Sequence, residues 1–305
     1  MQLGQSRNTL EQVRKFMVEI KDKESGDVLA TVEADSLRDA DLREMDLANA
    51  HLCGCDLGGC DLRGTRFDNS DLTNADLSCS NLSGASLRGA HLDGANLQGA
   101  NLKSARIGSS RRSHAAVLDG CDLTGADLSD ADLRYVSMRN ANLAGAVLHR
   151  ADMCDIDCSH CNLSGTSASN LLMIHANLQE ANLEKADYRD SHLNASNLYR
   201  ANMTGMILGS NHEEGFSAIN LANLQEANMA GISMRNIAAE ECNMKKANLT
   251  DADLTDAVLS GTIMRNANVR NANFQGVELV SVTMSFANFS EALNANIPDF
   301  KQNLR

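Results

Sequence analysis

A metal site or an acid–base pair is the first chemistry that this sequence suggests. One short stretch holds three thiols and an imidazole, the ligands that zinc prefers: Cys154, Cys158, His160 and Cys161. Two further histidines, His114 and His212, each lie where the sequence pattern described below is interrupted. Two imidazoles in one cleft could act as general acid and base. Whether any of these side chains meet depends on the elements that carry them.

The chain of 305 residues is built on a five-residue repeat. Units such as Ala75-Asp76-Leu77, Ala126-Asp127-Leu128 and Ala247-Asn248-Leu249 consist of a small residue, Asp or Asn, and an apolar central residue, followed by two mostly polar residues. A helix repeats every 3.6 residues and a strand every two, so neither gives a stripe with period five. The pattern predicts a coil that turns a corner every five residues, with the central and small residues inside.

These A-(D/N)-L-x-x units resemble the pentapeptide-repeat family. The resemblance implies an all-β fold, a right-handed quadrilateral parallel β-helix with four units per coil. We expect about 13 coils and a rod about 60 Å long. Central residues run from Leu37 to Phe289, which predicts a repeat domain over 35–289. Because the ends of a solenoid need covering, we expect an N-terminal capping segment, 1–34, and a C-terminal cap, 290–305.

Both expected caps carry weaker patterns. Apolar residues alternate on either side of a polar turn, which predicts a β-hairpin: Phe16, Val18, Ile20, then Val28, Ala30 and Val32. Helical spacing competes for the first of these strands: Leu10, Val13, Met17 and Ile20. A short helix followed by the hairpin reconciles the two. At the other end, apolar spacing with Pro298 in the first turn predicts a short helix: Leu293, Ile297, Phe300 and Leu304.

Two breaks, residues 108–117 and 209–218, divide the repeat into three blocks in unbroken frame. The blocks run from Leu37 to Ile107, from Leu118 to Leu208 and from Ile219 to Phe289, and each break is a step of 11 residues. We favour two units plus a one-residue bulge, which places both breaks on one side of the rod, about 24 Å apart. The alternative is one unit with six inserted residues, which places them on adjacent sides.

This frame separates the candidate metal ligands. Cys158 and Cys161 occupy inward positions, whereas Cys154 and His160 point outward, so we expect no metal site and no cofactor. Four cysteines in the small position should be packing residues: Cys55, Cys60, Cys121 and Cys242. Cys53 and Cys79 should lie outside. A redox role for these two or for Cys154 would require a neighbouring cation that lowers the thiol pKa.

The breaks are the better candidates for binding, because loops on a rigid scaffold are where recognition residues gather. The first is basic, with Arg111, Arg112 and His114. The second is acidic with one aromatic residue: His212, Glu213, Glu214 and Phe216. The competing interpretation is that both are tolerated insertions. At their expected separation the two histidines cannot share a substrate, and no catalytic motif is present.

Charge and composition narrow the class of partner. The net charge of −13 disfavours direct nucleic-acid binding and leaves room for a basic protein surface. The nine cysteines are an odd number, and neither a secretory signal nor an apolar run long enough to cross a membrane is visible. We expect a bacterial, cytoplasmic protein that is a monomer or an end-to-end dimer.

A non-enzymatic protein-interaction scaffold is therefore the predicted function. The alternative follows from the family, which includes proteins that protect DNA gyrase from quinolones: an acidic rod of duplex-like width that mimics DNA. A mimic needs its acids on one or two sides. On the favoured frame, thirteen aspartates just before central residues are spread evenly over four faces, which suits a local structural role at the corners.

Overall fold

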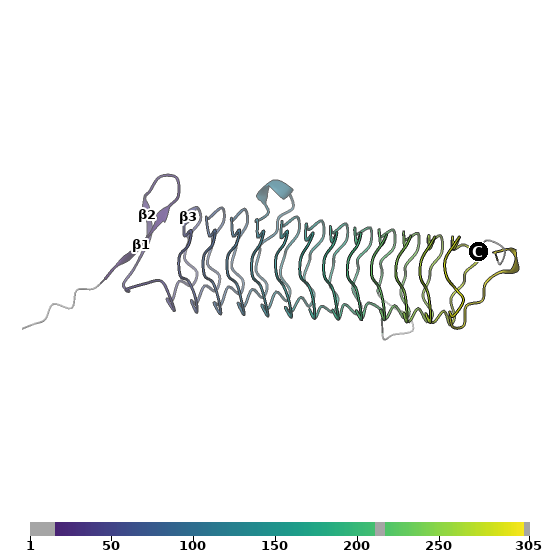
Figure 1. Cartoon of the computed structure of the whole chain (residues 1–305). Coiled ribbons are helices and arrows are strands. Elements are labelled where there is room, and N and C mark those ends of the chain that lie inside the picture. Colours follow the sequence, from purple (N-terminus) through teal and green to yellow (C-terminus); the bar gives the residue numbers. More distant parts are fainter. Residues whose placement is uncertain (1–15, 211–216, 302–305) are drawn as a thin grey trace, which may run out of the picture.

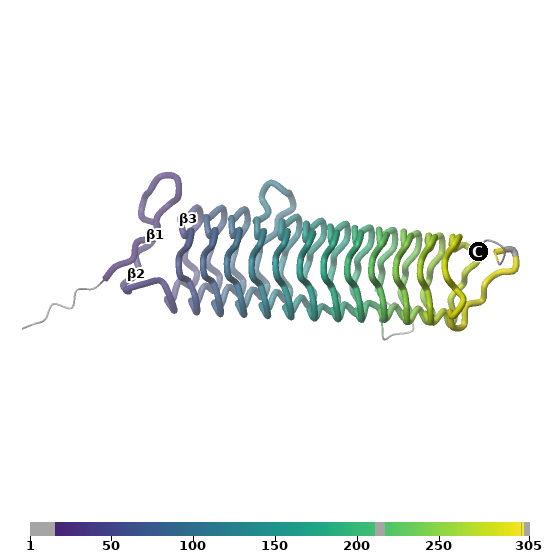
Figure 2. The backbone as a smooth tube through the Cα atoms, in the orientation of Figure 1, coloured from purple at the N-terminus to yellow at the C-terminus, as the bar shows by residue number. Residues whose placement is uncertain are grey.

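The computed structural model describes residues 16–210 and 217–301, which form one elongated rod (Figure 1). Regular elements are few and short: β1 (Val18–Asp22), β2 (Val28–Val32), β3 (Ala50–His51), and the 3-10 helices η1 (Arg112–His114) and η2 (Asp299–Lys301). Most of the chain winds in successive coils along the rod, as the backbone trace shows (Figure 2). The predicted all-β coil is confirmed.

Parallel bridges join each coil to the next. Asp41 pairs with Asp61, and the same interval recurs along four separate ladders. Four five-residue units thus complete one coil, as predicted. In the described residues the longest ladder has thirteen members, from Asp41 to Leu293. We number the faces from one to four in chain order, with Leu37 on face one.

A tight turn forms every corner. The backbone N–H of Ala40 donates to the carbonyl of Leu37 at 3.1 Å, and the same bond recurs in later units. The second residue after most central residues is left-handed, with φ of 57° at Asn69 and 69° at Gly120. Gly and Asn adopt this conformation at low cost, and Asp tolerates it. The corner geometry therefore explains why these three residue types are common in that position.

The interior is a continuous column of central and small residues. Leu42, Leu62 and Leu82 have no exposed surface, and neither does Ala75. Several polar side chains in the small position donate to a backbone carbonyl one coil below: the Cys60 thiol to Leu37 at 2.8 Å, and the Thr65 hydroxyl to Leu42 at 2.7 Å. A small side chain with one donor can therefore be paired in this position. Ser70 is an exception among the described residues, because its buried hydroxyl has no hydrogen-bond partner.

One bulky side chain interrupts the column of leucines. Tyr188 occupies a fully buried central position, and its hydroxyl accepts a hydrogen bond from Thr166 at 3.1 Å. Burial raises the pKa of this phenol. Ser167 bridges to Asp187, so Ala168 is the central residue one coil below on the same face, in a position where leucine is common. The small residue offsets the volume of the large one.

The N-terminal hairpin joins the sheet of face four. β1 pairs antiparallel with β2 and with β3, which belongs to the first coil, and Ile20 is buried in the common core. The predicted hairpin is confirmed. The helical alternative is wrong for the described residues from Val18 onward, because their backbone bonds go to neighbouring strands. Leu10 and Val13 lie outside the described residues.

The C-terminal end differs from the prediction. The backbone N–H of Leu293 donates to Ala272, so the ladder continues past Phe289 and no helix begins at Leu293. The only helical segment in the described part of this end is η2, three residues long. Within η2, the carbonyl of Pro298 accepts a hydrogen bond from the backbone N–H of Lys301. The Lys301 ammonium also donates to two carbonyls of the preceding coil. Leu304 lies outside the described residues.

Candidate functional site

The first break is a single unit with six inserted residues. His91 bridges to Val117, six positions beyond the partner that a regular coil would supply, and His192 bridges to Ala218 by the same interval. Our favoured interpretation of two units with a bulge is therefore wrong, and the alternative is confirmed. The first break lies between faces three and four and the second between faces two and three. They leave from adjacent corners of the rod.

Both breaks begin with the same backbone feature. The N–H groups of Ile107 and Gly108 both donate to Asp132 O, and those of Leu208 and Gly209 both donate to Ser233 O. A Cβ atom on Gly108 would lie 2.3 Å from the backbone nitrogen of Arg134. Glycine is required here because the chain approaches the next coil too closely for a side chain.

Loop 1, residues 108–115, projects from the rod and is tied down at both ends (Figure 1). Ser109 N–H donates to Arg134 O at 3.1 Å, and Ala116 N–H donates to Ile107 O at 3.2 Å. The predicted recognition residues Arg111, Arg112 and His114 are exposed. The residues predicted in the second break lie outside the described residues: His212, Glu213, Glu214 and Phe216.

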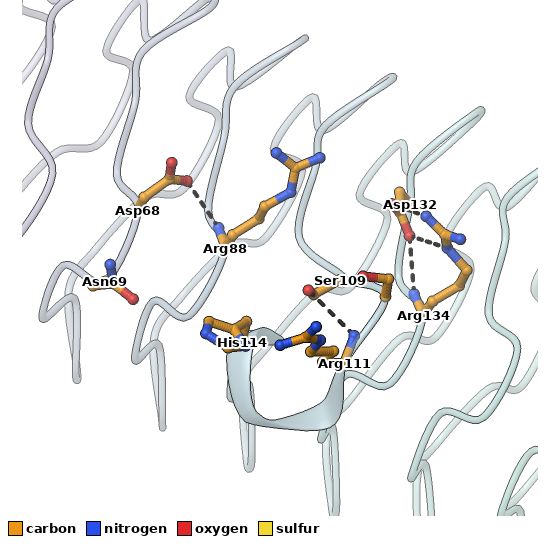
Figure 3. Close-up of a pocket in the computed structure, with 9 residues that line it drawn as sticks. Asp68, Asn69, Arg88, Ser109, Arg111, His114, Asp132 and Arg134 are labelled. Carbon is orange, nitrogen blue, oxygen red and sulfur yellow. Dashed lines mark hydrogen bonds and ion pairs between the residues drawn. The ribbon is translucent and has the colours of Figure 1, made fainter.

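A hollow of about 520 Å³ lies between loop 1 and the wall of the rod (Figure 3). Loop 1 contributes Ser109, Ser110, Arg111 and His114. The wall contributes residues from three coils, which sequence analysis missed: Asp68, Asn69, Arg88, Asp132 and Arg134. The lining is polar and charged throughout, so the hollow suits a charged ligand group and not an apolar one.

The two acids of the hollow are already engaged. Arg134 holds Asp132 with two bonds, 2.9 and 2.8 Å. Burial alone would raise the pKa of Asp132, but the bonds from Arg134 outweigh it and hold that pKa below its ordinary value. Asp68 accepts a hydrogen bond from Ser86 at 2.5 Å and pairs with Arg66 at 3.3 Å. Among the described residues, neither carboxylate forms an ion pair with Arg88 or Arg111, the two other guanidinium groups that line the hollow.

A second hollow joins loop 1 to the N-terminal hairpin. Lys23 and Glu24, from the hairpin turn, line a space of about 490 Å³ with Arg112 and Ser113. The Lys23 ammonium donates to the carbonyl of Asn69 at 2.5 Å. Two segments that are far apart in sequence thus form one continuous surface over face four.

The candidate metal ligands lie as predicted. Cys158 and Cys161 are buried, Cys154 is half-buried and His160 is exposed. Within residues 16–210 and 217–301, no three His, Cys, Asp or Glu side chains could hold a metal ion. Partial burial raises the pKa of Cys154 to about 11, opposite to the change that makes a thiol reactive.

The remaining cysteines also follow the frame. Cys60, Cys121 and Cys242 are buried and Cys55 is half-buried in the small position, whereas Cys53 and Cys79 are exposed.

The thirteen aspartates have the structural role that we expected. Each accepts a hydrogen bond from the backbone N–H two residues later, as Asp41 does from Arg43 at 3.2 Å. Their distribution needs correction, since the second block shifts by one face and the third block by two. Face two carries five: Asp41, Asp61, Asp127, Asp187 and Asp253. Faces one, three and four carry three, three and two.

No helix in the described part of the chain is long and apolar enough to cross a membrane. Among solved structures, HetL is 25% identical with a TM-score of 0.40, and the match covers 85% of this chain and 94% of HetL. HetL is a pentapeptide repeat protein involved in heterocyst differentiation regulation, from the cyanobacterium Nostoc sp. strain PCC 7120.

Trypsin-treated QnrB1, a plasmid-mediated fluoroquinolone resistance protein, is 18% identical with a TM-score of 0.35, over 65% of this chain and 89% of that one. Rfr23, from the cyanobacterium Cyanothece 51142, is 32% identical with a TM-score of 0.14, over 38% of this chain and 62% of Rfr23. No curated protein sequence matches the chain.

The family model for pentapeptide repeats matches in eight copies, which together cover most of the chain: residues 36–74, 75–108, 121–157, 141–179, 156–194, 176–209, 222–265 and 252–293. These copies coincide with the coiled part of the structure and leave out most of both breaks. The chain belongs to the pentapeptide-repeat family, whose fold is the right-handed β-helix.

Proposed function

We propose that this protein is a non-enzymatic scaffold that binds a protein partner through loop 1. The observation that carries the proposal is the inserted segment itself. A coil closes in four units without it, yet loop 1 adds six residues that bury no apolar side chain larger than that of Ala115. The insertion contributes little to the core, and it presents Arg111, Arg112 and His114 to solvent from a firmly held base.

A catalytic role has weaker support. Ser113 and His114 come within hydrogen-bond distance, at 3.0 Å between Oγ and Nδ1. A nucleophilic serine needs a base that is oriented in turn by a third group. In the described residues His114 forms no ion pair with a carboxylate, so the contact lacks the orienting partner.

The alternative function is a DNA mimic that acts on a topoisomerase such as gyrase, the class suggested by family members that confer quinolone resistance. The thirteen-member ladder corresponds to a rod of about 58 Å, or about 17 base pairs of duplex. Charge pairing argues against it. On face two, the acids Asp41, Asp61 and Asp187 are each paired with an arginine two residues later. Unchanged gyrase supercoiling, with and without a quinolone, at micromolar protein would remove the alternative.

Deleting residues 110–115 tests the scaffold proposal. The deletion joins Ser109 to Ala116 and restores a regular five-residue unit between Ile107 and Leu118, so the rod should keep its fold. We expect affinity capture from the native host to recover a partner with the full chain and to lose it with this variant. The expected loss is at least tenfold, because truncating a few central contacts removes most of the binding energy of an interface.

The matched control deletes residues 211–216, which likewise restores a regular unit between Leu208 and Ile219. Circular dichroism and thermal unfolding check that both shortened rods are folded. Retention of the same partner by both deletion variants, at unchanged affinity, would count against recognition through the breaks.

The proposal also includes the cytoplasm as the compartment. All nine cysteines are free thiols, as expected where glutathione keeps proteins reduced. A monomer and an end-to-end dimer, the two oligomeric states we expect, differ twofold in mass, which analytical ultracentrifugation resolves.

A further inference from the structure

Unpaired positive charge is concentrated around loop 1. Most arginines of this acidic protein lie beside a carboxylate. Five arginines of the described chain form no ion pair, and four of them belong to loop 1 or to the two coils that precede it: Arg88, Arg106, Arg111 and Arg112. The fifth is Arg265, on a distant coil. Arginine stays charged at any physiological pH, so these charges are available to an anion from outside.

Two of these guanidinium groups flank the hollow of about 520 Å³. Arg88 extends from face three and Arg111 from loop 1, on opposite sides of the space (Figure 3). Ser109 and Ser110 also line the hollow and add hydroxyl donors. An anion between the two arginines would therefore meet charged donors on two sides, with the neutral hydroxyl donors in the lining of the same hollow.

The surroundings hold this arrangement in place. The main chain of loop 1 is tied to the next coil by the bond from Ser109 to Arg134, and its turn is closed by the bond from His114 N–H to Arg111 O at 3.0 Å. Arg88 N–H donates to the Asp68 carboxylate at 3.2 Å, which fixes the base of that side chain. Little backbone ordering is then needed when a ligand binds, and pre-organisation of this kind favours affinity.

We infer that this hollow binds the phosphate group of a phosphate monoester. A guanidinium fork matches phosphate oxygens two at a time, and a tetrahedral dianion offers oxygens to both forks and to the hydroxyls at once. A carboxylate offers two oxygens in one plane, which one arginine satisfies. The inference rests on the proposed function, because it names the chemistry that loop 1 recognises. The phosphate comes either from a phosphorylated side chain of the partner or from a small free phosphate.

Calorimetric titration at fixed ionic strength tests the inference with three probes: inorganic phosphate, a short phosphoserine peptide and acetate. We expect the full chain to bind phosphate or the phosphopeptide at least tenfold more tightly than acetate. The phosphopeptide binds more tightly than inorganic phosphate if the source is a protein, and more weakly if the source is a small molecule. Equal binding of acetate would overturn the inference, and so would binding of none of the probes.

Substitutions test whether phosphate binding depends on the two arginines that flank the hollow. Arg88→Gln and Arg111→Gln should each weaken phosphate binding at least tenfold, whereas Arg265→Gln, which removes an unpaired arginine elsewhere, should leave it unchanged. Equal weakening by all three would indicate unspecific charge attraction and contradict the site.

These experiments distinguish a failure of the proposed function from a failure of the phosphate inference. If deleting residues 110–115 abolishes partner capture but the full chain binds no phosphate, loop recognition stands and this inference is wrong. If phosphate binds but the deletion leaves capture unchanged, the site stands and the proposed function is wrong.

Discussion

A Gly108→Ala variant is expected to lose at least about 2 kcal/mol of stability, because overpacking against atoms that cannot move is costly. The added methyl would lie 2.3 Å from the nitrogen and 2.6 Å from the oxygen of Arg134, both backbone atoms. Those atoms cannot withdraw, since Ser109 N–H is bonded to the same Arg134 oxygen and Gly108 N–H to Asp132 O. Thermal unfolding followed by circular dichroism measures the loss.

A second glycine provides the control. At Gly120 an added Cβ meets nothing within 4 Å, and the left-handed conformation there is one that Asn69 adopts elsewhere in the rod. Gly120→Asn should therefore change stability by less than about 0.5 kcal/mol. Gly209→Ala should behave like Gly108→Ala, because Arg235 backbone atoms lie 2.4 and 2.5 Å from its added methyl. Wild-type stability of Gly108→Ala would contradict the described start of loop 1.

The second large effect concerns the buried tyrosine. Tyr188→Leu removes most of an aromatic ring from a site with no exposed surface and should cost about 2–4 kcal/mol through the cavity it leaves, while the Thr166 hydroxyl keeps its hydrogen bond to Leu163 O at 2.8 Å. Ala168→Leu adds volume one coil below and should cost about 1–3 kcal/mol.

The double variant makes this prediction sharper. Ala168→Leu with Tyr188→Leu places leucine in both central positions, the commonest arrangement in this core. We expect the double variant to be more stable than either single variant, because the added volume fills the cavity. Denaturation midpoints of the wild type, the two single variants and the double variant measure these differences in stability. If the stability losses of the two single variants simply add in the double variant, the side chains at positions 168 and 188 do not fill a common volume in the core.

The fold was largely predictable because the repeat is local. Each five-residue unit contains its own corner, its own inward residues and its own Asx hydrogen bond, so the position of Cys158 or Asp41 follows from counting. The pairing of the buried tyrosine with Ala168 requires one further step, the number of units per coil. Nothing in the sequence around Ala168 or Tyr188 shows that the two lie on neighbouring coils until four units per coil are assumed.

The site was less predictable, for a reason that lies in the first break. The step from Ile107 to Leu118 satisfies two units plus one residue and one unit plus six equally well. Bonds between coils decide between them, and these join residues such as His91 and Val117 that lie more than a regular coil apart in the sequence. On our favoured frame Arg134 fell on a different face from Arg88, so the hollow that both line could not be predicted.

The central claim is that a partner contacts this rod through loop 1. Its most direct test places a photo-reactive phenylalanine analogue at Arg112 in the native host and compares it with the same analogue at Lys185, whose side chain is 76% exposed on another corner. We expect a covalent adduct of higher mass after illumination from position 112 and none from position 185. Adducts from position 185 alone, or equal adducts from both positions, would contradict it.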